Sequence, residues 1–205
     1  SNYLMSTYIE GYTEHIINSG VSVIDLSTGK SYIHTIEHNG DSNHWVDEIS
    51  RYINYYNPNE ILFQTNNYNL TYDNVINMWD INHNSIQINH YNDKLFLNIS
   101  YQNELLQKVY RLNTMLSPIE YFDMEQKNEL RNSFIYLLNY IQEHKVDILL
   151  NINHPIEIKN IDYFKLNSNS IRQLNVVNNY SYYKGTNDSL LSVCNSCKTP
   201  MGRRL

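Results

Sequence analysis

The feature that most restricts the folds open to this chain is a β-hairpin pattern in residues 19–36. Residues 19–26 are nearly all apolar and rich in β-branched side chains, which is typical of a strand covered on both faces. Ser27-Thr28-Gly29 then supplies a turn, because glycine adopts positive φ without steric cost. Residues 30–36 alternate between two faces, as a returning strand does. The chain is therefore expected to build a sheet around this hairpin.

Residues 1–116 continue the pattern with further strands and helices. A helix from Ser42 to about Tyr55 has apolar side chains at helical spacing, and Asn57-Pro58 ends it. The expected strands are residues 3–10, 19–26, 30–36, 60–64 and 85–90, and the other expected helices start at Thr71 and span residues 101–116. Three strands, a helix and a strand in this order predict one α/β domain, a mixed sheet with flanking helices.

Residues 117–205 have a different, mostly α-helical pattern. A long helix is expected from Asp123 or Glu125 to about Lys145, because its apolar residues fall on one stripe. The other expected elements are an extended segment at residues 156–166 and helices at residues 170–176 and 189–197. The change of pattern places a domain boundary near Ser117-Pro118.

The last residues carry the pattern of a helix-to-helix corner. Thr199-Pro200 ends one helix and starts another, since threonine caps helices well and proline suits the first helical position. Gly202 falls near the start of the second helix, where a missing side chain allows a neighbouring helix to approach closely. We expect this corner to set the crossing of two helices.

Three segments resemble the MutS family of DNA mismatch-recognition proteins. The closing run is similar to the family's core-domain signature through Asn195, Cys197, Lys198, Thr199, Pro200, Gly202, Arg204 and Leu205. Residues 163–174 resemble the strand and helix that precede this signature. The opening hairpin of the family's connector domain is matched by Asp25, Leu26, Ser27 and Gly29. Asn195 and Cys197 are typical of eukaryote-like members, and the abundance of asparagine fits a giant-virus or organellar lineage.

The resemblance implies that residues 1–116 form a connector domain, which is ribonuclease-H-like in fold and not catalytic. Residues 117–205 are then the N-terminal part of a core (lever) domain. The full-length parent is expected to form homo- or heterodimers of MutS-like subunits, to clamp mismatched double-stranded DNA and to use ATP and Mg2+. This segment itself is expected to hold no cofactor, to link the mismatch-binding and ATPase domains, and to offer repair partner proteins a surface on the connector.

Charge is distributed unevenly along the chain. Residues 1–115 carry 5 Lys/Arg and 12 Asp/Glu, a net charge of −7, whereas residues 116–205 carry 10 and 9, a net charge of +1. An acidic surface is a poor match for DNA phosphates, so residues 1–115 are not expected to grip nucleic acid directly. The sequence has no apolar run long enough for a membrane span, and its two cysteines without a secretory signal favour an intracellular, reducing compartment.

Few residues have the spacing of a metal or nucleotide site. Cys194 and Cys197 make half of a zinc site at most, and as an i, i+3 pair on an apolar helix face they are predicted to be buried structural thiols. The histidine pairs His34/His38 and His83/His90 lie near strands, and neither forms a His-x3-His pair on a predicted helix. No phosphate-binding loop occurs in the sequence. For Tyr180, Tyr182 and Tyr183, core packing or a solvated loop is favoured over base stacking beside Lys184.

Two other classes of function remain open at this point. A ribonuclease-H-like sheet can carry a two-metal nuclease, for which the candidate ligands are Asp25, Glu37, Glu60 and Asp73. Asp25, however, runs directly into a turn, where aspartate more often bonds its own backbone. The second alternative is a non-enzymatic protein-interaction module.

Overall fold

The structure is a computed structural model. It describes residues 2–11, 16–66, 70, 72–79, 87–89, 95–144, 149, 151–158, 166, 168–176, 189–199 and 201–202. The chain divides into two compact units, a first unit of Ser1–Ile161 and a second unit of Asp162–Leu205. Each unit is described by itself.

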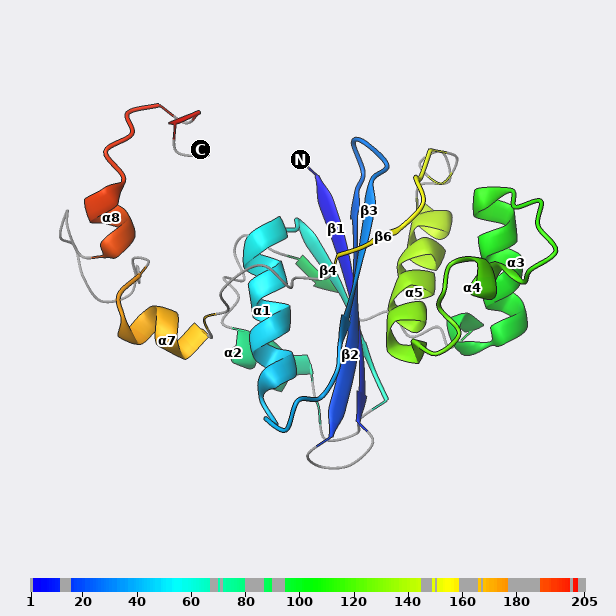
Figure 1. Cartoon of the computed structure of the whole chain (residues 1–205), viewed down its shortest axis with the longest axis horizontal. Coiled ribbons are helices and arrows are strands. Elements are labelled where there is room, and N and C mark those ends of the chain that lie inside the picture. Colours follow the sequence, from blue (N-terminus) through cyan, green and yellow to red (C-terminus); the bar gives the residue numbers. More distant parts are fainter. Residues whose placement is uncertain are drawn as a thin grey trace. The chain divides into compact units, whose positions relative to one another are not determined.

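A six-stranded mixed sheet forms the centre of the first unit (Figure 1). In spatial order the strands are β5 (Gln87–Asn89), β4 (Glu60–Thr65), β1 (Tyr3–Gly11), β2 (Ile17–Asp25), β3 (Ser31–Ile36) and β6 (Ile156–Glu157). The predicted hairpin is confirmed, because β2 and β3 pair antiparallel from Ser19 opposite Ile36 to Ile24 opposite Ser31. The pairs β1–β4, β4–β5 and β3–β6 are parallel, so the sheet is mixed as expected.

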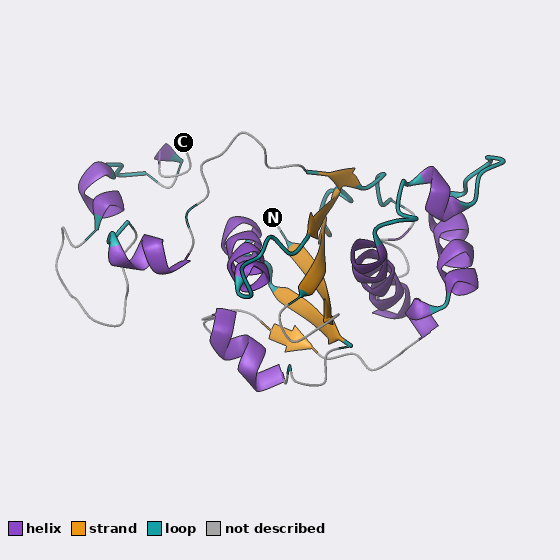
Figure 2. Cartoon of the chain, turned by 60° about the horizontal axis from the view of Figure 1, so that its bottom comes forward, coloured by secondary structure: helices purple, strands orange, loops and turns teal. Residues whose placement is uncertain are grey.

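Helices cover both faces of this sheet (Figure 2). One face carries α1 (His44–Tyr56) and α2 (Tyr72–Trp79), and the other carries α5 (Asn128–His144), with α3 (Ile99–Tyr110), α4 (Pro118–Tyr121) and the short 3-10 helix η1 (Leu95–Leu97) on the same side. Two apolar clusters result. Val21 and Val23 of β2 join the cluster of α1, while Ile24 joins the cluster of α5, as the two-residue repeat of a strand requires. The α/β class is therefore confirmed.

The contact between α5 and the sheet is unusually close at β2. Gly20 faces the first turn of α5, and a Cβ atom built on it would lie 2.3 Å from the carbonyl oxygen of Glu129. Ser133 of α5 donates a hydrogen bond to the backbone oxygen of Ser6 in β1 at 2.9 Å. Small residues on this part of the sheet thus allow helix and strand backbones to approach one another.

The first unit extends past the boundary expected near Ser117-Pro118. The apolar stripe of α5, which includes Leu130 and Phe134, packs on β1, β2 and β3, so this helix belongs to the same unit as the sheet. The helix expected at residues 101–116 is α3, and it ends earlier than predicted. Arg111 adopts a left-handed conformation (φ 48°) and caps α3 after Tyr110. Ser117 then starts α4 with a capping box that involves Glu120.

The second unit contains two short helices in its described part, α7 (Ser168–Gln173) and α8 (Leu190–Cys194). Backbone hydrogen bonds join them, from Leu190 N–H to the oxygen of Asn175 at 2.9 Å and from Leu191 N–H to that of Val176 at 3.0 Å. The helix predicted for residues 189–197 is shorter than expected. Whether the whole of residues 117–205 is mostly helical stays a prediction. Among the described residues, no helix is long and apolar enough to cross a membrane.

Candidate functional site

In the predicted connector hairpin, both carboxylate oxygens of Asp25 accept hydrogen bonds from the turn between β2 and β3. One carboxylate oxygen accepts a hydrogen bond from Ser27 N–H at 2.9 Å, and the other accepts one from the Thr28 hydroxyl at 3.0 Å. Burial alone would raise the pKa of Asp25, but these hydrogen bonds outweigh it and lower the pKa. Asp25 is therefore a turn-stabilising carboxylate, held ionised by donors from the turn itself.

Three of the four carboxylates of the nuclease hypothesis, those of Asp25, Glu37 and Glu60, are not brought together. Asp25 and Glu37 follow opposite ends of the β2–β3 ladder. Glu60 instead accepts a hydrogen bond from the Tyr140 hydroxyl at 2.5 Å. Asp73 belongs to α2, and its side chain lies outside the described part of the structure. Within the described residues, no group of three or more His, Cys, Asp or Glu is placed to hold a metal ion.

The hairpin turn is instead the docking place for the chain as it leaves the first unit. Gly29 has φ +72°, and a Cβ atom on it would lie 2.1 Å from the backbone oxygen of Asn151. Asn153 N–H donates to the Gly29 oxygen at 2.8 Å, and the Ser31 hydroxyl donates to the Asn153 oxygen at 2.9 Å. Ile152 between them is buried in the core. Residues 151–153, the anchor, are thus fixed to the turn by backbone contacts.

Three aromatic rings contact His154, the exposed residue that follows the anchor. The ring of His154 lies 5.3 Å from the rings of Tyr110 and Phe122 and 5.7 Å from that of Tyr121, measured between centroids. Burial raises the pKa of Tyr110, whose hydroxyl donates to the Asn153 oxygen at 3.3 Å. Side chains from α3, α4 and the end of α4 therefore contact residues 151–158, the exit segment.

Lys127, which lies just before α5, forms an ion pair with Glu157 of β6. Its ammonium group lies 2.9 Å from the carboxylate of Glu157 in β6 and 3.3 Å from that of Asp123. Burial alone would lower the pKa of Lys127, but the two carboxylates outweigh it and raise the pKa, so the lysine stays charged. The Thr35 hydroxyl of β3 also donates to Glu157, at 3.4 Å.

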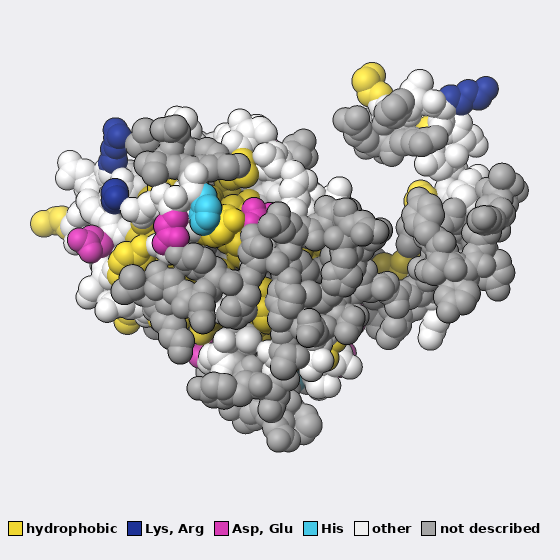
Figure 3. Space-filling model, turned by 180° about the vertical axis from the view of Figure 1, so that it is seen from behind, with side chains coloured by type: hydrophobic (Ala, Val, Ile, Leu, Met, Phe, Trp, Pro, Cys, Tyr) yellow, Lys and Arg dark blue, Asp and Glu magenta, His cyan; other side chains and the backbone are white. Residues whose placement is uncertain are grey.

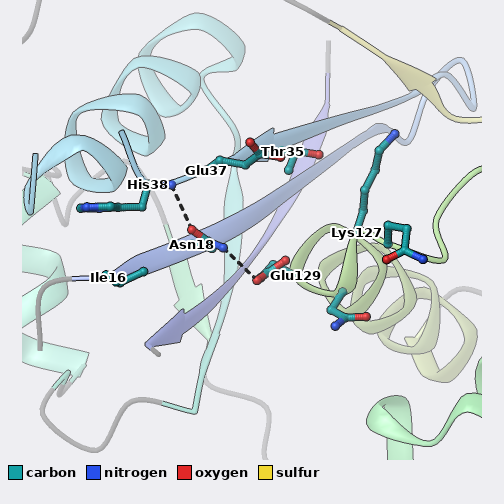
Figure 4. Close-up of a pocket in the computed structure, with 9 residues that line it drawn as sticks. Ile16, Asn18, Thr35, Glu37, His38, Lys127 and Glu129 are labelled. Carbon is teal, nitrogen blue, oxygen red and sulfur yellow. Dashed lines mark hydrogen bonds between the residues drawn. The ribbon is translucent and has the colours of Figure 1, made fainter. Parts of the chain in front are cut away.

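A polar cleft of about 400 Å³ opens beside Lys127, between α5 and the ends of β2 and β3 (Figure 4). Asn18 bridges this cleft: its amide oxygen accepts from His38 N–H at 2.9 Å, and its amide nitrogen donates to Glu129 at 3.4 Å. Burial, and then the charge of Glu129, raise the pKa of nearby Glu10. The surroundings are acidic, which disfavours an anionic ligand.

The closing signature is partly visible in the second unit. The Thr199 hydroxyl accepts a hydrogen bond from Gly202 N–H at 3.2 Å, which is the bond that a capping threonine makes. The Asn195 side chain accepts one from Cys197 N–H at 3.2 Å. Pro200, Arg204 and Leu205 lie outside the described residues, so the helix-to-helix corner stays a prediction, and no contact bears on the role of Lys198.

The prediction that the two cysteines are buried is wrong for this chain. Cys194 and Cys197 are both exposed, because α8 ends at Cys194 and its described residues bury no side chain. His34 is buried, with its Nε2 atom 2.8 Å from the Tyr56 hydroxyl, while His83, His90, Tyr180, Tyr182, Tyr183 and Lys184 lie outside the described residues.

Sequence reasoning missed the exit segment as a site. Residues 151–155 have no periodic pattern, and the extended segment expected from Ile156, where β6 lies, gave no sign of its partners. The turn at Gly29 and Lys127 lie far away in sequence. The available signals were Pro155, which stops a helix, and a glycine at the end of a turn.

Comparison with known proteins defines the class. No protein-family model matches the chain. It is 31% identical over 233 residues to the putative DNA mismatch repair protein mutS homolog L359 of Acanthamoeba polyphaga mimivirus, covering 100% of the chain and 21% of that protein. It is 29% identical over 210 residues to the DNA mismatch repair protein MutS of Caldanaerobacter subterraneus subsp. tengcongensis, with the same two coverages.

These similarities run along the entire chain and are all to proteins of DNA mismatch repair. The chain belongs to the MutS family, as its hairpin and closing signature predicted. It spans 21% of the length of these two relatives. Among solved structures, the Fowlpox virus resolvase in complex with Holliday junction DNA has a TM-score of 0.38 and 12% identity, over 68% of this chain and 97% of the resolvase.

Proposed function

We propose that this chain is the mechanical link between the mismatch-binding and ATPase domains of a MutS-family DNA mismatch-repair protein. The first unit serves as the connector domain, with a ribonuclease-H-like arrangement of its sheet, and the second unit begins the core (lever) domain. The full-length parent binds mismatched double-stranded DNA as a homo- or heterodimer and uses ATP with Mg2+. No step of catalysis is assigned to this segment.

The observation that carries this proposal is the firm attachment of the anchor, residues 151–153, to the hairpin of β2 and β3. The anchor packs against Gly29 at backbone distance and buries Ile152, so a displacement of the sheet pulls directly on the chain that follows. A rigid attachment of this kind is what a link between two distant sites needs, because coupling travels through packed elements.

Charge supports a role away from the DNA backbone for the first unit. This unit carries 9 Lys/Arg and 19 Asp/Glu, a net charge of −10, while the second unit carries 6 and 2, a net charge of +4. On the face drawn in Figure 3, the described part of the first unit has no broad basic patch. Phosphate binding needs clustered lysine and arginine, so the first unit is unsuited to grip a duplex.

Protein contacts fit the first unit better. Met115 is fully exposed and Leu116 is 56% exposed in the loop between α3 and α4, where the capping box at Ser117 holds the end of the loop. Neighbouring apolar side chains presented in this way are suited to docking a repair partner protein.

The proposal is tested by exchange of segments. The matching part of the Caldanaerobacter MutS is replaced by this chain, and ATP hydrolysis is measured with mismatched and with perfectly paired duplex. We expect the chimera to keep a difference between the two duplexes, and we expect Gly29→Ala, which loosens the anchor, to reduce that difference without reducing mismatch affinity.

Two results contradict the proposal. One is a folded chimera whose mismatch-dependent ATP hydrolysis is unaffected by Gly29→Ala. The other is cleavage of DNA by the purified chain with Mg2+ or Mn2+ that Asp25→Asn abolishes, which would favour the nuclease.

A further inference from the structure

The exit segment is held in two parts of unequal strength. The anchor, residues 151–153, has a buried side chain, a backbone contact with Gly29 and hydrogen bonds at 2.8 and 2.9 Å. The strap, residues 156–158, begins with Ile156, which is 53% exposed. The anchor is therefore tied to the core through Ile152, and the strap lies on the surface.

The strap has few attachments. It pairs with β3 at only two positions, Ile156 opposite Tyr32 and Glu157 opposite Ile33, and Ile158 N–H donates to the Ile33 oxygen at 3.2 Å (Figure 1). A two-residue ladder at the border of a sheet is only marginally stable. The side chain of Glu157 adds two further attachments: it accepts a hydrogen bond from the Thr35 hydroxyl at 3.4 Å and forms an ion pair with Lys127 at 2.9 Å.

The ion pair between Glu157 and Lys127 is partly accessible to solvent. The side chains of Lys127 and Glu157 are 25% and 24% exposed, so water and salt ions reach the pair. Lys127 also has a second carboxylate within reach, that of Asp123, whose side chain is 96% exposed. The lysine therefore keeps a partner when Glu157 leaves, which lowers the cost of release.

Pro155 separates anchor and strap. The proline ring fixes φ and removes a backbone donor, so no hydrogen-bond ladder runs through this position. The strap thus has a stiff boundary at one end, across which opening does not spread into the anchor.

We propose that the strap is a releasable latch, closed by the Lys127–Glu157 pair, which detaches from β3 while the anchor stays in place. Release frees three residues, about 10 Å of extended chain, between the anchor and the second unit. This rests on the proposed function, because a longer free connection weakens the mechanical coupling of the two units. Higher ionic strength favours the released state, since salt screens a partly exposed ion pair, though less strongly than a fully exposed one.

Two backbone amides report on the latch separately. Ile158 N–H bonds to Ile33 in the strap, and Asn153 N–H bonds to Gly29 in the anchor. Hydrogen exchange followed by NMR on the full chain is expected to be faster at Ile158 than at Asn153. Lys127→Met is expected to speed exchange at Ile158 by about 5-fold, the factor that corresponds to a partly exposed ion pair. Exchange at Asn153 stays unchanged.

Asp123→Asn is the matched control, because it removes the other partner of Lys127 and leaves the strap intact. It is expected not to speed exchange at Ile158, whereas Glu157→Gln matches Lys127→Met. Raising the salt concentration reproduces the effect in the wild type and not in Lys127→Met.

Equal exchange rates at the two amides in the wild type would overturn the latch, and so would a Lys127→Met chain in which Ile158 exchanges no faster or both amides accelerate together. The urea midpoint shows that each variant is folded. Because this readout is independent of DNA and ATP, failure of the latch is distinguishable from failure of the proposed function.

Discussion

Gly20→Ala tests whether α5 rests on the sheet at backbone distance. The new Cβ atom would lie 2.3 Å from the Glu129 oxygen, 2.4 Å from the Glu129 carbonyl carbon and 2.5 Å from the Leu130 Cα atom. All three are backbone atoms of the first turn of α5, so no side-chain rotation relieves the conflict. An ordinary contact begins at 3.4 Å, so the start of the helix must retreat from β2 by about 1 Å.

The retreat has a cost that follows from what α5 buries. Leu130 and Phe134, both fully buried, lose part of their dispersion contacts with the sheet when the helix moves. Overpacking in a core costs about 1–3 kcal/mol, and a conflict with backbone atoms belongs at the upper end. A loss of about 3 kcal/mol lowers the urea midpoint by about 1–3 M, given the usual dependence of stability on denaturant.

Urea unfolding followed by far-ultraviolet circular dichroism measures this midpoint. Ser22→Ala is the matched control in the same strand, because the buried Ser22 hydroxyl has no hydrogen-bond partner and alanine adds no atom. We expect the control to be neutral or slightly stabilising. A Gly20→Ala chain with the midpoint of the wild type would refute the close contact between α5 and β2.

Two further predictions concern the hairpin turn at Gly29 and the buried His34. Gly29→Ala, at φ +72° and 2.1 Å from the Asn151 oxygen, is expected to cost about 2 kcal/mol or more, against about 1 kcal/mol for Gly40→Ala, at φ +95° with open space around it; equal urea midpoints would contradict the anchor. Burial lowers the pKa of His34 from its ordinary value of 6.5 to about 4, so the unfolded chain binds a proton in this window and the folded chain does not. The contribution of neutral His34 to the free energy of unfolding is therefore complete above pH 6.5 and is lost as the pH falls toward 4. We expect the wild type to lose about 2–3 kcal/mol more than His34→Gln over this range. Urea midpoints of the two chains that fall in parallel between pH 7 and pH 4.5 would argue against this.

Local patterns predicted most of the first unit because they depend on neighbouring residues. The alternation in β3, the apolar run of β2 and the turn at Gly29 are each decided within a few positions, and the structure confirms them. The helix at residues 42–55 is also present, although its N-cap is Asn43 and not Ser42.

Long-range packing was not accessible in the same way. The stripe of α5 predicts an amphipathic helix but not the surface that it covers, so the unit boundary near Ser117-Pro118 did not anticipate its docking on β2. The role of Gly20 is decided by Glu129, more than 100 residues later. The exit segment could not be predicted for the same reason, because its contacts with Lys127 and with the turn at Gly29 form only in the folded chain.

The position of β6 determines where the chain can be truncated without exposing an edge of the sheet. Although it is only two residues long, β6 covers part of the outer side of β3 at Tyr32 and Ile33. A shorter piece that stops before Ile156 leaves this hydrogen-bonding row bare, and a bare row is a template on which a second molecule can add a strand. Such a truncation is expected to aggregate at concentrations where the complete chain stays dispersed.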